Sequence, residues 1–148
     1  MPHITDRPIK SISKELEFLK QDLDSKIPPK KLDRNILIAT WNIRAFGNLT
    51  RKWISRGEDS PKRDLHSILC IAEILSRFDV IAIQEVATRR EGADAIGHLH
   101  SELNRRGSKW DYILSDPTSG AGTERYAYIW KSKSIKLSGR PWLVKAQN

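Results

Sequence analysis

Two short apolar runs with a helical pattern between them constrain the fold of this chain most. Residues 35–41 (NILIATW) and 79–84 (DVIAIQ) are rich in β-branched side chains, which is typical of buried strands. Apolar residues recur between them at the spacing of a helix that packs on a sheet, at Leu65, Ile68, Leu69, Ala72, Leu75 and Phe78. We expect that helix to begin at Ser60-Pro61. The pattern predicts a strand–helix–strand unit of an α/β protein.

A second helical pattern and further strands follow this unit. The helix carries Ala93, Ile96, Leu99 and Leu103 on one face and ends at Gly107. Residues 110–114 and 124–131 then have strand character, and residues 134–137 are expected to begin a fifth strand. The class we predict is therefore α/β, or α+β, with a mixed order of elements.

The first part of the chain has a different pattern. Residues 11–25 place leucines and isoleucines at helical spacing among charged residues, and the prolines of residues 27–31 end this amphipathic helix. We expect residues 1–34 to form a helix with its linker, and residues 35–148 to form the main folding unit.

Composition limits the class of protein and its partners. Hydrophobic residues make up 39% and charged residues 30% of the 148 residues, which argues against a disordered or membrane protein. Cys70 is the single cysteine, which excludes an internal disulfide. Its apolar neighbours indicate a structural thiol. With no apolar signal core in residues 1–10, this favours a cytoplasmic protein. The formal charge of +8 favours nucleic acid as a partner, although a solvated basic surface explains it equally well.

Polar residues follow both predicted strands of the first unit. Asn42 ends the first strand and Glu85 ends the second. Adjacent strands of an α/β sheet bring their carboxyl ends together, and ligand sites collect at that edge. A carboxylate beside an amide oxygen suits a hard cation such as Mg²⁺, which takes few protein ligands and keeps waters. A solvated strand end is the alternative.

Three motifs resemble the endonuclease/exonuclease/phosphatase superfamily. They are TWNIRAFG at residues 40–47, DVIAIQEV at 79–86 and TERYAYIWK at 123–131, in the order and spacing of the superfamily. The motifs Asn-Ile-Arg-x-Phe-Gly and Glu-Arg-Tyr most resemble those of the branch around deoxyribonuclease I. The likeness runs from about residue 35 to residue 142. It implies one half of a four-layer α/β/β/α sandwich and a Mg²⁺-dependent phosphodiesterase, with DNA favoured over RNA as substrate and Mn²⁺ or Ca²⁺ as alternative ions.

The resemblance also implies roles for individual residues. Glu85 matches the superfamily's metal-binding glutamate, and Asn42 matches the asparagine beside the metal and the scissile phosphate. Arg44 lies where the superfamily's arginine approaches the nucleic-acid backbone. Glu124 matches the carboxylate that hydrogen-bonds a catalytic histidine later in the chain. From the residues alone, Arg44 is equally an exposed loop cation, and Glu124 a partner of Arg125.

The sequence departs from the deoxyribonuclease I branch at two contact positions. Ala87 replaces an arginine two residues after the metal glutamate, and Gly122 replaces a tyrosine that contacts the DNA groove. We therefore expect minor-groove contacts of that kind to be absent. One face of the last strand carries the aromatic residues Tyr126, Tyr128 and Trp130. We predict that they belong to the core and do not stack on bases.

The motifs of the second half of the superfamily do not occur here. No histidine or carboxylate side chain follows Glu124, so the general base for water cannot come from its usual place. Half of a sandwich would also expose an apolar sheet face. We therefore expect the chain alone to be inactive, with self-association or a complementing C-terminal half as partners. The alternatives are a lipid or nucleotide phosphatase, a non-catalytic nucleic-acid-binding module and a truncated product.

Overall fold

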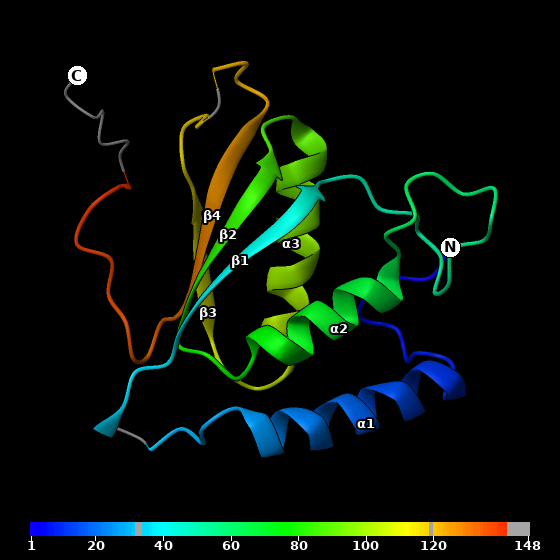
Figure 1. Cartoon of the computed structure of the whole chain (residues 1–148), viewed down its shortest axis with the longest axis horizontal. Coiled ribbons are helices and arrows are strands. Elements are labelled where there is room, and N and C mark those ends of the chain that lie inside the picture. The colour runs from blue at the N-terminus through cyan, green and yellow to red at the C-terminus, as the bar shows by residue number, and fades with distance from the viewer. Residues whose placement is uncertain (32–33, 119, 142–148) are drawn as a thin grey trace.

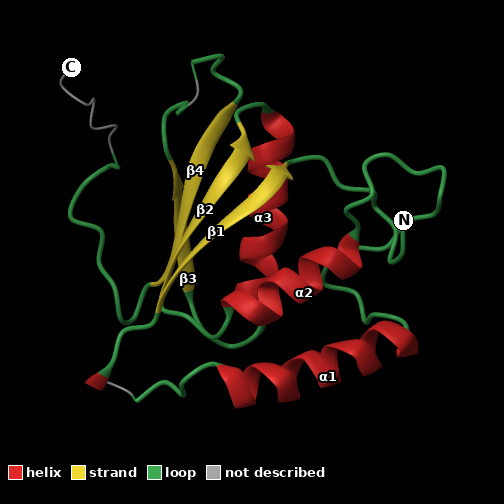
Figure 2. Ribbon diagram, viewed as in Figure 1, coloured by secondary structure: helices red, strands yellow, loops and turns green. Residues whose placement is uncertain are grey.

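The computed structural model describes residues 1–31, 34–118 and 120–141, and in them one mixed sheet is covered by helices on one face (Figures 1 and 2). The strands lie in the order β1-β2-β4-β3, with β1 and β2 parallel and the other pairs antiparallel. The elements are α1 (Lys10–Lys26), β1 (Ile38–Phe46), α2 (Leu65–Leu75), β2 (Val80–Ala87), α3 (Arg90–Arg105), β3 (Trp110–Leu114) and β4 (Glu124–Lys131). The predicted α/β class is confirmed. The half-sandwich stays a prediction.

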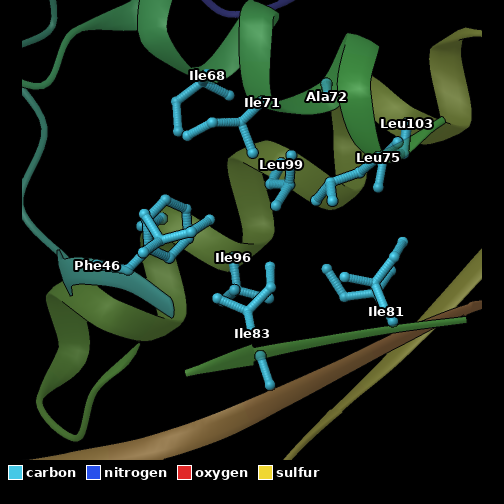
Figure 3. Packing of buried hydrophobic residues seen from close by; sticks show 14 of the residues in the cluster. Phe46, Ile68, Ile71, Ala72, Leu75, Ile81, Ile83, Ile96, Leu99 and Leu103 are labelled. Atoms are coloured by element: carbon cyan, nitrogen blue, oxygen red, sulfur yellow. The ribbon is translucent and has the colours of Figure 1, made fainter. Parts of the chain in front are cut away.

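The core lies between the sheet and the helices that cover one of its faces. Helix α3 packs on β2 and β3, α2 packs on α3, and α1 packs on α2. Ile81 and Ile83 of β2 point toward the helices and are fully buried (Figure 3). Ile12 of α1 is buried in the same cluster. The first helix therefore shares the main core, while the predicted division at residue 34 is not tested by the structure.

Helix α2 begins later than predicted. Its N-cap is Asp64, whose carboxylate accepts a hydrogen bond from the Ser67 N–H at 2.9 Å and completes a capping box. The segment before it is held by Thr50, whose N–H donates to the Arg63 carbonyl and whose hydroxyl donates to the Pro61 carbonyl. The start at Ser60-Pro61 was therefore wrong, because the backbone of residues 61–63 bonds to the loop after β1.

The first strand is shifted and much less buried than predicted. It begins at Ile38, whose side chain is 71% exposed, and Ile36 before it is 59% exposed. Strand β1 is at the edge of the sheet and has only β2 as its neighbour. Apolar composition predicted burial on both faces, but in the described residues the helices cover only one.

The face of the sheet opposite the helices carries the aromatic residues of β4. Ala127 and Ile129 are fully buried on the helix side. Tyr126 and Tyr128 alternate with them and are half-buried, so their prediction as core residues was wrong. Trp130 is buried on this second face but stands outside the main cluster. No described helix or strand covers this face.

The expected fifth strand does not form. After β4 the N–H groups of Ser134 and Ile135 both donate to the carbonyl of Lys131, so the chain turns instead of extending. Leu137 is 48% exposed. The end of the resembling stretch, residue 142, and residues 143–148 lie outside the described residues. None of the described helices is both long enough and apolar enough to cross a membrane.

Candidate functional site

Paired bulges in β1 and β2 form the base of the candidate site. The strands pair regularly up to Asn42 and Gln84, and pairing resumes at Phe46 and Val86. Three residues of β1 are thus opposite the single residue Glu85. Glu85 has φ of 59° and Ala45 has φ of 47°, a left-handed conformation that non-glycine residues seldom adopt.

Core packing explains why the bulges form. Ile43 and Phe46 of β1 are both buried among the helices, and so are Ile83 and Val86 of β2. Residues three apart in a regular strand point to opposite faces of the sheet. An extra residue in each strand lets both members of each pair reach the core. Both predicted strand ends were therefore placed too early, since each strand continues beyond its bulge.

The bulges turn Glu85 away from the core and toward β1. The Asn42 side chain lies beside its carboxylate and favours the charged form. The Ala45 N–H donates to Oε2 of Glu85 at 3.2 Å. These two donors, and then the positive charge of Arg44, hold the pKa of Glu85 below its ordinary value. The carboxylate is therefore ionised across the physiological pH range.

Arginines surround the β1 bulge. The Arg44 side chain is exposed, and its backbone carbonyl accepts a hydrogen bond from Arg63 at 2.6 Å. Arg63 also donates to the Ala45 carbonyl at 2.9 Å, and its guanidinium lies over the Phe46 ring. Burial lowers the pKa of Arg63, although an arginine stays charged at neutral pH. The bulge is thus positively charged on both sides.

Glu124 lies at the same end of the sheet on the next strand. Its Cα pairs with that of Ala87, two residues after Glu85. Its carbonyl accepts hydrogen bonds from the N–H and hydroxyl of Thr118, which fold the preceding loop back onto β4. Of the residues singled out in the sequence, Asn42, Arg44 and Glu85 are therefore brought together, and Glu124 is placed one strand away.

The two departures from the deoxyribonuclease I branch have structural counterparts. Gly122 has φ of 66°, which a tyrosine at this position would adopt only with strain. Its carbonyl accepts a hydrogen bond from the Thr88 hydroxyl at 2.7 Å. The carbonyl of Ala87 lies 2.0 Å from where a Cβ on Gly92 would be, so a glycine is required for α3 to begin there. The end of β2 is thus fitted closely to α3.

Sequence reasoning missed Ala45 and Arg63. A bulge at Ala45 was detectable from the spacing of apolar residues. In the first strand they occur at 41, 43 and 46, and in the second at 81, 83 and 86, so that in each strand the spacing changes from two residues to three. Such a change indicates a bulge. No pattern identified Arg63, since its contact with the bulge depends on the loop between β1 and α2. For Cys70 on α2, burial raises the pKa of the thiol, in agreement with a structural role.

The donor set suits a hard cation with few protein ligands. When the Asn42 amide donates to Glu85, its oxygen stays available beside the carboxylate. These are ligand types that Mg²⁺ accepts, with water or a phosphate completing the shell. Within residues 1–31, 34–118 and 120–141, no three His, Cys, Asp or Glu side chains cluster as a closed metal site would require.

Several known proteins with similar sequences are deoxyribonucleases. The deoxyribonuclease of Thioalkalivibrio sp. (strain K90mix) is 31% identical over 108 residues, which cover 71% of this chain and 25% of that protein. Deoxyribonuclease-1 of Rattus norvegicus is 29% identical over 109 residues, covering 72% and 34%, and that of Sus scrofa is 29% identical over 110 residues, with the same coverage. The chain is related to the deoxyribonuclease I-like proteins. No family model matches the sequence.

The relationship covers only part of each relative. The chain spans 25% to 34% of the length of these deoxyribonucleases. The matched stretch of about 110 residues is long enough to include the three motifs and the bulged strands. The predicted resemblance to deoxyribonuclease I is therefore confirmed.

Proposed function

We propose that the Asn42–Glu85 pair is the metal-binding and phosphate-binding part of a Mg²⁺-dependent DNA endonuclease. The observation that carries this proposal is the position of Asn42 and Glu85 side by side at the paired bulges, in a chain similar in sequence to deoxyribonucleases. When bound, the ion neutralises charge on a phosphate oxygen and orients the phosphodiester. Glu85 holds the ion as an ionised carboxylate, and the Asn42 oxygen supplies a second ligand.

The surrounding cations fit a DNA backbone. Arg44 is exposed beside the pair, and Arg89 and Arg90 are exposed where β2 leads into α3. Contacts from arginine to phosphate position a nucleic acid without reading its sequence. Glu124, one strand away, would orient a proton-carrying group. A complementing segment or partner would provide the base that activates water, because Glu85 is assigned to the metal and its lowered pKa makes it a weak base.

Metal binding can be tested on the chain itself. Mn²⁺ replaces Mg²⁺ as a paramagnetic probe, and we expect it to broaden the backbone NMR signals of Ala45, Gln84 and Val86 first. Glu85→Gln should abolish this selective broadening. Glu17→Gln is the matched control. It makes the same chemical change at an exposed residue of the outer helix α1. Equal broadening in both variants would refute the metal assignment.

Catalysis requires a separate assay. The chain is incubated with supercoiled plasmid and Mg²⁺, with EDTA and Glu85→Gln as controls. We expect no nicking by the chain alone. Nicking that disappears in both controls would show that the active site is completed without a further partner, and nicking that persists in EDTA would contradict the metal-dependent mechanism.

Non-catalytic binding of nucleic acid is the second candidate, and the formal charge of +8 favours it. Binding of a short DNA duplex is measured in EDTA over a range of salt concentrations. A binding module would keep its affinity in EDTA and lose it steeply with salt. Binding that requires the divalent ion and depends on Glu85 would favour the nuclease.

A further inference from the structure

The conformation of the β1 bulge depends on contacts from outside the sheet. Ladder pairing with β2 is interrupted between Asn42 and Phe46, so the carbonyls of Arg44 and Ala45 lack strand partners there. Both carbonyls instead accept hydrogen bonds from Arg63, at 2.6 Å and 2.9 Å. One guanidinium thus bonds two successive peptide units of the strained segment.

The side chain of Arg63 extends from a well-anchored backbone. Its own carbonyl accepts a hydrogen bond from the Thr50 N–H at 2.8 Å. The next residue, Asp64, is 6% exposed, and its two carboxylate oxygens accept from the N–H groups of Ser67 and Ser55. The base of Arg63 is therefore fixed at the beginning of α2, and the guanidinium rests on the Phe46 ring with 5.2 Å between Cζ and the ring centroid.

The same peptide units carry the contacts to Glu85. The N–H of Ala45 donates to Oε2 of Glu85, while the carbonyl of Ala45 accepts from Arg63. Ala45 keeps a φ of 47°, which is strained for a residue with a Cβ, and the contacts of its peptide units help to hold it. Without the two bonds from Arg63, the segment would relax toward extended geometry and move its N–H away from the carboxylate.

We infer that Arg63 is a positioning residue of the Asn42–Glu85 site, acting by holding the β1 bulge in the conformation that presents Ala45 N–H to Glu85. The inference rests on the proposed function for its consequence on metal binding. The conformational part stands on the contacts of Arg63 alone. A guanidinium is suited to this role because its planar fork holds its N–H groups in a fixed orientation, whereas the N–H groups of an ammonium rotate on a flexible stem.

The test compares Arg63→Met with Lys62→Met in the isotope-labelled full chain. Lys62 is the matched control, since it is an exposed cation in the same loop and its Nζ donates only to carbonyls of that loop, those of Arg56 and Gly57. The first readout is the NOE between the amide proton and Hα of Ala45, which is strong at positive φ and weak in an extended strand. The second is the Mn²⁺ affinity measured from line broadening near Glu85.

Arg63→Met should weaken the Ala45 NOE, speed hydrogen exchange of the Ala45 amide and lower the Mn²⁺ affinity roughly tenfold, as the loss of an outer-shell partner does. Lys62→Met should leave all three unchanged. A folded Arg63→Met that keeps the NOE and the Mn²⁺ affinity, even with a lower melting temperature, would reduce Arg63 to a structural residue and overturn the inference.

A conservative variant decides the matter if Arg63→Met does not fold. Arg63→Lys keeps a cation over Phe46 but has a shorter side chain without the planar fork, so a smaller loss of the Ala45 NOE and of Mn²⁺ affinity is expected. Full retention of both would overturn the inference. Absence of Mn²⁺ binding in the wild-type chain would instead count against the proposed function, and the NOE would still report whether Arg63 holds the bulge.

Discussion

Nζ of Lys30 lies 3.0 Å from Oδ2 of Asp79, so the segment after α1 is tied to the beginning of β2. Asp79 is 1% exposed, and the same oxygen accepts the N–H of Leu37 at 2.8 Å. Nζ of Lys131, at the end of β4, lies 4.0 Å from the other oxygen. One buried carboxylate thus joins three segments of the chain at the end of the sheet opposite the candidate site.

Asp79 should make the stability of the chain depend on acid pH. Burial alone would raise its pKa, but the hydrogen bonds from Leu37 and Lys30 and the charge of Lys131 hold it below the ordinary value. A lowered folded pKa contributes stability that is present above the unfolded pKa of about 3.9 and is lost as pH falls through the folded pKa. Asp79→Asn should cost about 2 kcal/mol at pH 7, and the difference from wild type should shrink below pH of about 3.9. Urea unfolding at both pH values measures this.

Asp22→Asn provides the control for that experiment. Asp22 is exposed and forms only a surface pair with Lys26, so its loss should change the free energy of unfolding by less than about 1 kcal/mol at either pH. If the difference between wild type and Asp79→Asn were the same at pH 7 and in acid, the depressed pKa of Asp79 would be wrong.

The sequence predicted the order of elements well, because core burial sets the period of each pattern. Residues 110–114 and 124–131 form strands with the predicted bounds, and α1 differs from prediction by one residue at each end. Errors arose where local hydrogen bonds decide the outcome, as at the capping box of Asp64 and the turn after Lys131. These depend on side-chain geometry, which periodicity does not contain.

A glycine at position 45 should be tolerated far better than one in the regular part of the same strand. Ala45 has φ of 47°, so Ala45→Gly removes a steric cost of about 1–2 kcal/mol that roughly cancels the entropic cost of glycine. Ala39→Gly is the matched change, and Ala39 pairs regularly with Ile81. We expect Ala39→Gly to destabilise by about 1 kcal/mol and Ala45→Gly to lie near zero. Equal losses in chemical denaturation would contradict the positive φ.

The candidate site was only partly predictable for a related reason. Asn42 and Glu85 could be identified as polar residues near strand ends, and parallel pairing brought those ends together. The contact of Glu85 with the backbone of β1, however, exists because the bulges turn its carboxylate toward that strand. Arg63 reaches the bulge from a loop whose path no sequence pattern describes. Contacts that depend on loop paths therefore required the structure.

Truncation of an isoleucine to alanine should reduce the free energy of unfolding by different amounts on the two faces of the sheet. Ile38 is 71% exposed and Ile81 is fully buried, although both lie on neighbouring strands in similar apolar runs. Ile81→Ala should cost about 3–4 kcal/mol because it leaves a cavity, whereas Ile38→Ala should cost less than about 1 kcal/mol. Equal losses in urea denaturation would mean that Ile38 is covered in solution.

A network of charged residues joins α2 and α3, and the stability of the chain should depend on Arg106 more than on Arg105. Arg106 contacts both Glu73 of α2 and Glu102 of α3, whose side chains are almost completely buried. Arg105 bonds Glu102 through two nitrogens, at 2.8 Å and 2.7 Å, but its own side chain is 48% exposed. Removing Arg105 leaves Glu102 paired with Arg106, so Arg105→Ala should cost about 1 kcal/mol.

Arg106→Ala removes the group that both buried carboxylates share, and only Arg77, 3.2 Å from Glu73, then remains beside that carboxylate. We expect a loss of about 3 kcal/mol, since each buried carboxylate then keeps a single arginine partner. Glu73→Gln added to Arg106→Ala should recover part of the loss, because it removes one of these poorly compensated charges. The four chains are compared by urea unfolding. Additive losses in the double variant would show that Arg106 and Glu73 are not coupled, and would assign the stability to packing of the arginine stem.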